Sequence, residues 1–302
     1  MLCRGTFGAH GSTLPHARFH GSAGGSVLNL NNGFGQVVTT ITSPNSAIGA
    51  TSIIQLGTAT LTVGNSSAAS VATFYGSLRG TGGLTKGGAS TQILAGANSY
   101  TGATNVTKGT LQFGTAATAG ALSSSSAIDL TTGGTLALVK ITGNTFASSV
   151  TSDASGTLLV NSAANNTLSG ALTDSGSGQL TFTQSGTGTT ILTNSANTYR
   201  GLTTITSGTL QVGSATAAGS LGTNANVVVT TGGNLSLVNI AGAITIASTS
   251  GTLTLDLANN DTLSNPIADN GHLVATGLLS NNYIVASPIS GTAPSPKLAA
   301  TP

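Results

Sequence analysis

Hydrophobic residues alternate with single polar residues in short stretches along most of the chain. This period of two predicts β-strands with one buried face, and the Gly, Asn and Ser residues between the stretches favour turns. The chain has no sustained period of 3.6 residues, so its pattern does not indicate a helical fold. The predicted strands are Thr60–Val63, Thr91–Leu94, Thr110–Phe113, Thr135–Val139, Thr157–Val160, Leu180–Phe182, Thr189–Leu192, Thr209–Val212, Asn234–Val238 and Thr252–Leu255.

One motif occurs twice, at residues 98–114 and 197–213, with an offset of 99 residues. Both copies contain Gly-Thr-Leu-Gln, and the likeness continues to a Gly-Gly-x-Leu-x-Leu-Val segment that begins at Gly133 in one copy and Gly232 in the other. Internal repeats of this kind indicate a repetitive architecture. The residues that we expect to have a structural role in the motif are Asn98, Tyr100, Gly102, Gly109, Leu111 and Gly114, matched by Asn197, Tyr199, Gly201, Gly208, Leu210 and Gly213.

A second set of matches has an offset of 95 residues, as between Asp174 and Asp269, each two residues before a glycine. The chain therefore contains a module of about 95–99 residues, present about two and a half times between residues 57 and 287. A strand of four or five residues is not stable alone, but copies stacked at ~4.8 Å form continuous sheets. This arrangement is a parallel β-solenoid, an all-β fold, with Leu111, Leu210 and their partners Leu136 and Leu235 in its core.

Other all-β folds fit the chain less well. A sandwich or propeller is typically less interrupted by glycine, and an outer-membrane barrel needs aromatic girdles and segments of ~10 residues. The domain organisation that we predict is a poorly ordered leader at 1–25, a β-helix repeat region at 26–287 and a Pro-rich disordered tail at 288–302. No secretory signal peptide is recognisable in residues 1–26, and Cys3 alone cannot form an internal disulfide.

Charged residues make up 5% of the chain, with a net charge of +2, whereas hydrophobic residues make up 38%. The hydrophobic content argues against disorder of the whole chain. The eight Lys and Arg residues are scattered singly and aromatic residues are few, so we expect no nucleic-acid binding.

The residues from Asn98 to Gly114, and those from Asn197 to Gly213, resemble the passenger-associated transport repeat of autotransporters. The second copy has Arg200 where the first has Thr101. The resemblance implies a right-handed parallel β-helix that is exported and displayed on, or released from, a Gram-negative cell surface. The translocator barrel expected in that family is not recognisable in this chain, which makes a fragment one interpretation.

Candidate catalytic and metal-binding residues are sparse. His16 and His20 have the i, i+4 spacing of a helical metal site, but Pro15 precedes them and the segment has no helical pattern. Ser177 lies between two glycines, as a catalytic serine can, but a triad also needs a histidine. His272 is the one histidine of the repeat region, so a triad there is not expected. We therefore expect no enzyme activity, no metal site and no cofactor.

The function that the sequence favours is structural: an adhesin-type passenger segment whose repeats assist export and folding. Its partners would be a host surface or neighbouring cells, contacted through exposed loops, and its location extracellular or at the cell surface. Two alternatives stay open, a β-helix carbohydrate-active lyase or hydrolase and a truncated fragment without a function of its own. The six Asp residues could supply the two carboxylates of such an enzyme, but Asp174 and Asp269 occupy equivalent positions typical of turns. Asp129, Lys108 and Lys140 are not repeated in the second copy.

Overall fold

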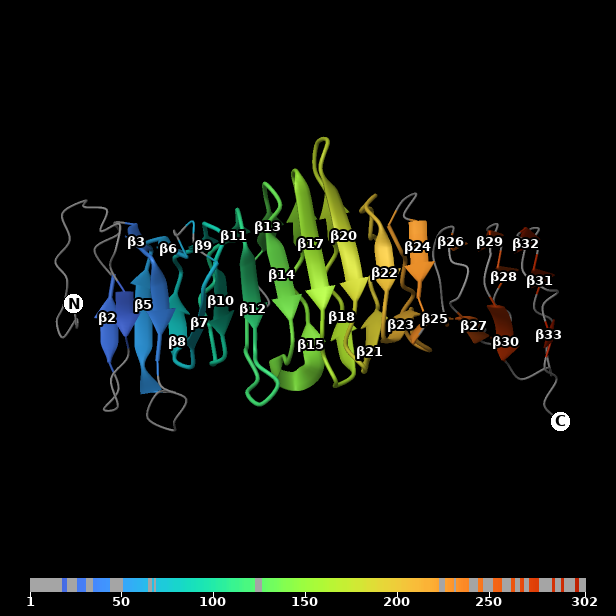
Figure 1. Cartoon of the computed structure of the whole chain (residues 1–302), viewed down its shortest axis with the longest axis horizontal. Coiled ribbons are helices and arrows are strands. Elements are labelled where there is room, and N and C mark those ends of the chain that lie inside the picture. The colour runs from blue at the N-terminus through green and yellow to red at the C-terminus, as the bar shows by residue number, and fades with distance from the viewer. Residues whose placement is uncertain are drawn as a thin grey trace.

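The computed structural model describes residues 26–30, 35–43, 51–64, 67, 69–122, 127–222, 226–230 and 232–238, together with the strands β1 and β26–β33. These strands form long parallel sheets that run along the molecule (Figure 1). The largest sheet has eleven strands: β7 (Val71–Phe74), β10 (Thr91–Leu94), β12 (Thr110–Phe113), β14 (Thr135–Leu138), β17 (Ser155–Val160), β20 (Gln179–Gln184), β22 (Thr203–Ile205), β24 (Asn226–Val229), β26 (Ile244–Ile246), β29 (Ile267–Ala268) and β32 (Ile289–Ser290).

Two further faces complete the wall of the molecule. A seven-stranded sheet contains β3 (Gln36–Val38), β6 (Leu61–Val63), β9 (Leu84–Lys86), β11 (Thr104–Val106), β13 (Ile128–Leu130), β16 (Val150–Ser152) and β19 (Leu172–Asp174). The third face holds a three-stranded sheet of β2 (Val27–Asn29), β5 (Ile53–Gly57) and β8 (Ser77–Gly80), and further along an eight-stranded sheet of β15 (Thr145–Phe146), β18 (Asn166–Leu168), β21 (Thr189–Leu192), β23 (Gly208–Val212), β25 (Gly233–Leu237), β27 (Thr252–Asp256), β30 (His272–Thr276) and β33 (Lys297–Leu298).

The remaining elements are small. The strands β1 (Arg18–His20) and β4 (Thr40–Thr42) pair with each other, as do β28 (Thr262–Leu263) and β31 (Ile284–Val285). A single 3₁₀ turn, η2 (Thr142–Asn144), lies just before β15, and among the described residues it is the one helical element that the structure names. No helix in the described part of the chain has the length and hydropathy needed to cross a bilayer.

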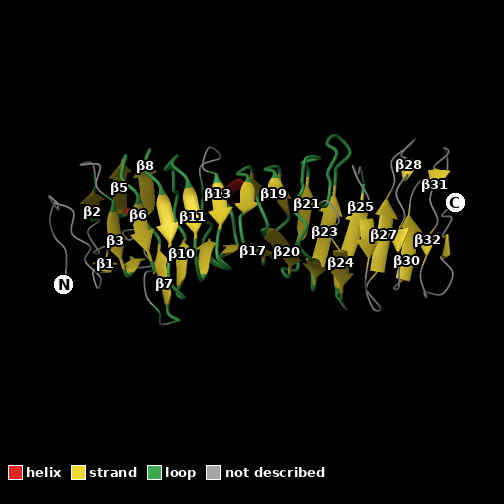
Figure 2. Cartoon of the chain, turned by 90° about the horizontal axis from the view of Figure 1, so that it is seen from above, coloured by secondary structure: helices red, strands yellow, loops and turns green. Residues whose placement is uncertain are grey.

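The chain visits the three faces in turn, so that β5, β6 and β7 make one turn and β8, β9 and β10 make the next. Figure 2 shows the same stacking from above. The predicted all-β parallel β-solenoid is therefore confirmed, and its right-handed sense stays a prediction. Turns differ in length, since 19 residues separate the paired Thr91 and Thr110 but 25 separate Thr110 and Thr135.

Columns of inward side chains form the core. Leu111 pairs with Leu136 and Leu136 with Leu158 in the eleven-stranded sheet, and all three are 0% exposed. Burial of each leucine contributes roughly 1.5–3 kcal/mol relative to leaving it in water, before the entropy of ordering is subtracted. On the outside, threonine columns share hydrogen bonds between turns, as between the hydroxyls of Thr157 and Thr181 at 3.0 Å.

Each of the ten strands predicted from alternation corresponds to a strand of the structure, with ends shifted by up to two residues. The strands that alternation did not indicate are mostly short, and they include six of the seven strands in the seven-stranded sheet, such as β11 and β16. The predicted boundaries of the leader and the tail lie among residues that are largely outside the described part, and they stay predictions.

Candidate functional site

The asparagine that begins the first motif joins three successive turns of the solenoid. Asn98 is 4% exposed, and its Oδ1 accepts a hydrogen bond of 3.0 Å from the backbone N–H of Leu78, one turn earlier. Its Nδ2 donates to the backbone oxygen of Ala121, one turn later, at 3.0 Å. A buried backbone amide that loses its hydrogen-bond partner costs roughly 1–3 kcal/mol of stability. The Asn98 side chain therefore stabilises the stacking of its turn on the turn that contains Leu78.

The second copy repeats this arrangement. The Oδ1 of Asn197 accepts from the N–H of Leu172 at 2.9 Å, and its Nδ2 donates to the oxygen of Ser220 at 2.7 Å. Leu78 belongs to β8, the last strand of the three-stranded sheet, and Leu172 belongs to β19, the last strand of the seven-stranded sheet. In both places the motif follows the end of a sheet, and the amide side chain replaces hydrogen bonds that a further strand would make.

The motif tyrosines point into the core. Tyr100 and Tyr199 are both 0% exposed, and their hydroxyls hydrogen-bond the hydroxyls of Thr104 and Thr203 at 2.7 and 2.8 Å. Burial raises the pKa of Tyr100 well above its usual value and that of Tyr199 to about 12, so both phenols stay protonated. An interior tyrosine with a satisfied hydroxyl has no surface to offer a sugar or a partner, which favours a structural role.

The motif glycines allow close contact between turns. A Cβ at Gly102 would lie 2.4 Å from the oxygen of Gly82, and a Cβ at Gly201 would lie 2.2 Å from the oxygen of Leu180. The other four motif glycines have φ values of 64–80°, in the left-handed region that favours glycine. These are Gly109, Gly114, Gly208 and Gly213.

The two copies lie on different faces of the solenoid. Leu111 belongs to β12 in the eleven-stranded sheet, whereas Leu210 belongs to β23 in the eight-stranded sheet and pairs with Leu235. Both leucines are 0% exposed, which agrees with their predicted core position. An offset of 99 residues therefore corresponds to a whole number of turns plus one face.

A lysine that sequence reasoning missed is fully buried just upstream of the first copy. Lys86 is 0% exposed, and its Nζ donates to the backbone oxygens of Gly87, Gly88 and Lys108 at 2.5, 2.9 and 3.1 Å. Desolvation lowers its pKa to about 8. The signal that could have revealed it is the pair Leu84-Thr-Lys and Phe182-Thr-Gln, one module apart.

The counterpart of Lys86 in the second copy is Gln184, also 0% exposed. Its Nε2 donates to the oxygens of Gly186 and Gly188 at 2.8 and 3.1 Å, and its Oε1 accepts from the hydroxyl of Thr190 at 2.6 Å. A neutral amide thus holds the same glycine turn that an ammonium group holds in the first copy.

A salt bridge is particular to the second copy. Arg200 is 43% exposed, and its Nε lies 3.2 Å from Oδ2 of Asp174, which is 3% exposed. Oδ1 of Asp174 accepts from the N–H of Leu180 at 2.6 Å, and Nη2 of Arg200 donates to the oxygens of Gly176 and Gly178. This network holds the turn that contains the exposed Ser177, and it supports the interpretation of Asp174 as a turn residue.

The groups that a catalytic site would need are not gathered in the described residues. The side chains of His16, His20 and His272 lie outside that part of the structure. Within it, no cluster of three His, Cys, Asp or Glu residues could hold a metal ion. Asp129 has a raised pKa because of desolvation and, to a smaller extent, the nearby charge of Asp153.

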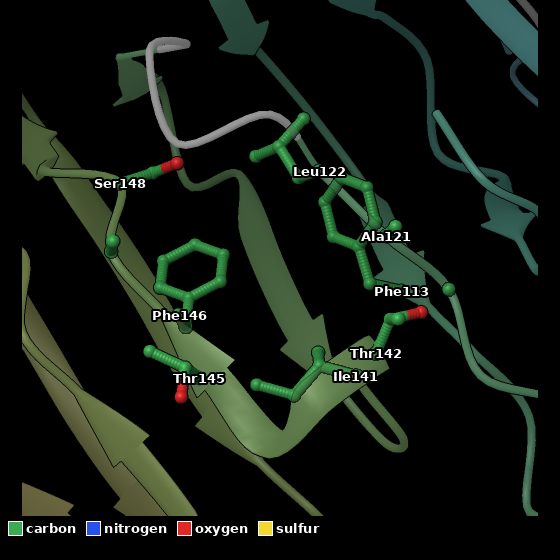
Figure 3. A pocket seen from close by; sticks show the side chains of 10 residues that line it. Phe113, Ala121, Leu122, Ile141, Thr142, Thr145, Phe146 and Ser148 are labelled. Carbon is green, nitrogen blue, oxygen red and sulfur yellow. The ribbon is translucent and has the colours of Figure 1, made fainter. Parts of the chain in front are cut away.

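One cavity lies where the third face has no regular sheet, between β8 and β15. Its volume is about 190 Å³, and the rings of Phe113 and Phe146 face it from opposite sides, with Leu122 and Ile141 between them (Figure 3). An apolar cavity of ~150 Å³ accommodates a benzene molecule, so this one has the size of a single ring. No charged residue is among those that line it, so it has no group for acid–base chemistry.

Comparison with known families gives one result. The model of the passenger-associated-transport repeat matches residues 84–113 and 182–212. Both matched segments contain the Lys86 or Gln184 turn and the Asn–Tyr–Gly motif described above. No curated protein and no solved structure matches the chain. The repeat matches and the parallel β-solenoid together support an autotransporter passenger β-helix, as the resemblance of the two motifs predicted.

Proposed function

We propose that the chain is a structural passenger segment of an autotransporter-like protein, which reaches the cell surface or the medium and folds turn by turn as it is exported. The observation that carries this proposal is the three-turn bridge of each motif asparagine, as between Leu78, Asn98 and Ala121. Because nearly all hydrogen bonds between turns join nearest neighbours, with Gln92 reaching Ile41 two turns earlier as an exception, a chain leaving a pore can add turns one at a time onto those already folded.

The adhesin-type role is the finer part of the proposal. Tyr100 and Tyr199 are buried and the motif serves the stacking, so recognition of a host surface or a neighbouring cell falls to exposed loops, such as the turn that Arg200 holds at Ser177. A passenger whose repeats build the scaffold and whose loops make contacts needs no catalytic group.

The proposal is tested by surface display of the chain fused to a translocator barrel in a Gram-negative host. Asn98→Ala and Asn197→Ala leave the buried amides of Leu78 and Leu172 without their partners, and we expect display to fall several-fold in each variant. Asn161→Ala, at an exposed asparagine, is the matched control and should display like the parent. Antibody labelling of intact cells, with total chain measured by immunoblot, gives the ratio.

Two deletions separate the motif from mere length. Phe182 pairs with Thr203, so deleting residues 182–202 removes one complete turn that includes Asn197. Thr135 pairs with Thr157, so deleting 135–156 removes one complete turn outside the matched segments. We expect the first deletion to lower display more than the second. Equal display in both, together with unchanged display of the asparagine variants, would contradict a role of the motif in export.

A further inference from the structure

The outer face of the eleven-stranded sheet differs from the rest of the surface in its chemistry. None of the strands described in this sheet contains Lys, Arg, His, Asp or Glu. Charged or titratable residues do occur in the strands of the other long sheets: Asp129 and Asp174 in the seven-stranded sheet, beside the inward Lys86, and Asp256, His272 and Lys297 in the eight-stranded sheet. We call this outer face of the eleven-stranded sheet the neutral face.

Two rows of side chains cover the neutral face where side chains are described. The first row is almost entirely threonine, and four of the eight residues in the second are apolar, among them half-buried Ile93 and Leu159. The rows follow from the strand register: Val71, Thr91, Thr110, Thr135, Thr157 and Thr181 in the first, and Thr73, Ile93, Gln112, Ala137, Leu159, Thr183, Thr204 and Val228 in the second.

We propose that the neutral face is an interaction surface for a second copy of this chain, packed sheet against sheet. Two copies present no like charges to each other there, so apposition costs no charge burial. A second solenoid also has the same ~4.8 Å spacing between turns, so its rows can interdigitate with these rows along the whole sheet, as in face-to-face sheet packing.

The size of the face is sufficient for a specific contact. Eleven strands at ~4.8 Å and a width of about four residues give roughly 600 Å², close to the ~800 Å² that each partner buries in a standard interface. Lys108 and Lys140, which lie in the turns before β12 and after β14, would stand at the rim in solvent. The association is therefore expected to persist at high salt.

Sedimentation velocity of the purified full chain over a range of concentrations tests this proposal. We expect a reversible dimer in the parent and at least a tenfold weaker association in Leu159→Lys and in Ile93→Lys, which place a charge in the middle of the face without touching the core. The matched control is Ile191→Lys, an outward, half-buried isoleucine of the eight-stranded sheet, which should associate like the parent. Circular dichroism of each variant confirms that the solenoid has formed.

Three outcomes would overturn the proposal: a parent that stays monomeric at every concentration, an Ile191→Lys variant that dissociates as much as Leu159→Lys, or Lys variants that associate like the parent. A monomeric parent that binds to insoluble cellulose, with loss of binding in Leu159→Lys, would assign the face to a polysaccharide instead. The inference goes beyond the proposed export role, and because the measurement is made on purified chain, its failure leaves that role untouched.

Discussion

The two copies of the repeat make the same contacts on different faces of the solenoid. Asn98 and Asn197 each join three turns, yet the first follows the three-stranded sheet and the second follows the seven-stranded sheet. The contacts therefore depend on the local turn and its nearest neighbours, and not on which face surrounds them. The copies differ at particular positions: an ammonium group at Lys86 against an amide at Gln184, and Thr101 against Arg200.

The largest effect is expected where the copies agree. Gly102→Ala and Gly201→Ala would place a Cβ within 2.4 Å and 2.2 Å of backbone oxygens one turn earlier, and backbone cannot move aside as a side chain can. Each should lower the free energy of unfolding by about 3 kcal/mol or more, measured by urea denaturation. Gly176→Ala is the control, since nothing lies within 4 Å of its added Cβ and its φ of 58° costs only about 1 kcal/mol.

A loss of stability in one copy only would show that the two copies are not equivalent in their stacking.

The next effect is a pH dependence of the free energy of unfolding that Lys86 causes and its counterpart Gln184 does not. The pKa of Lys86 is lowered to about 8 in the fold but is 10.5 in the unfolded chain, so between pH 8 and 10 the unfolded state holds the additional proton. The free energy of unfolding should therefore rise over this range, by about 2 kcal/mol. Above pH 10 the raised pKa values of Tyr100 and Tyr199 act in the opposite direction.

Lys86→Gln should remove this rise, and Gln184→Lys should add a second one. Urea denaturation at pH 7, 8, 9 and 10 gives one slope of unfolding free energy against pH for each of the three proteins, and comparison with the parent cancels the contributions of all other groups. If the parent and the Lys86→Gln variant had the same pH dependence, the pKa of Lys86 would not be lowered by folding. The three backbone oxygens around Lys86 would then stabilise its charged form as well as water does.

The smallest effect concerns the salt bridge. Arg200→Thr restores the residue type of the first copy, and because Arg200 is 43% exposed the change in global stability should be below about 0.5 kcal/mol. The turn at 175–178 loses two hydrogen bonds from Nη2, so hydrogen exchange at Gly178 should accelerate. Exchange at Thr101, in the first copy, is the internal reference; an unchanged rate at Gly178 would mean that Asp174 alone holds the turn.

The part of the fold that the sequence predicted is the part governed by side-chain alternation and repetition. Leu111 and Leu210 were assigned to the core because alternation requires it, and Asn98 and Tyr100 were assigned a structural role because they recur. The position of each copy on its face was beyond prediction, since it depends on turn lengths that vary between 18 and 26 residues and leave no mark in the motif itself.

Lys86 was missed for a different reason. A lysine is almost always found on the surface, and its burial here depends on three backbone oxygens that converge only after the turn at Gly87 and Gly88 has formed. The cavity between Phe113 and Phe146 could not be predicted from the sequence either, because it lies where one face of the solenoid has no strand. Alternation describes strands that exist and gives no sign of a strand that is absent.

The offset between the copies also bears on how such a chain changes by recombination. Unequal crossing-over between the two motifs would remove or insert 99 residues, and everything downstream would then continue from a neighbouring face of the solenoid. Because most inward residues on all three faces are apolar, with buried polar groups such as Lys86 and Gln184 among them, we expect the core to tolerate this rotation, while surface residues are carried to a new side. Three such insertions would return the downstream strands to the face on which they started. Gene duplication alone can therefore move exposed loops around the solenoid axis without substitutions in the core.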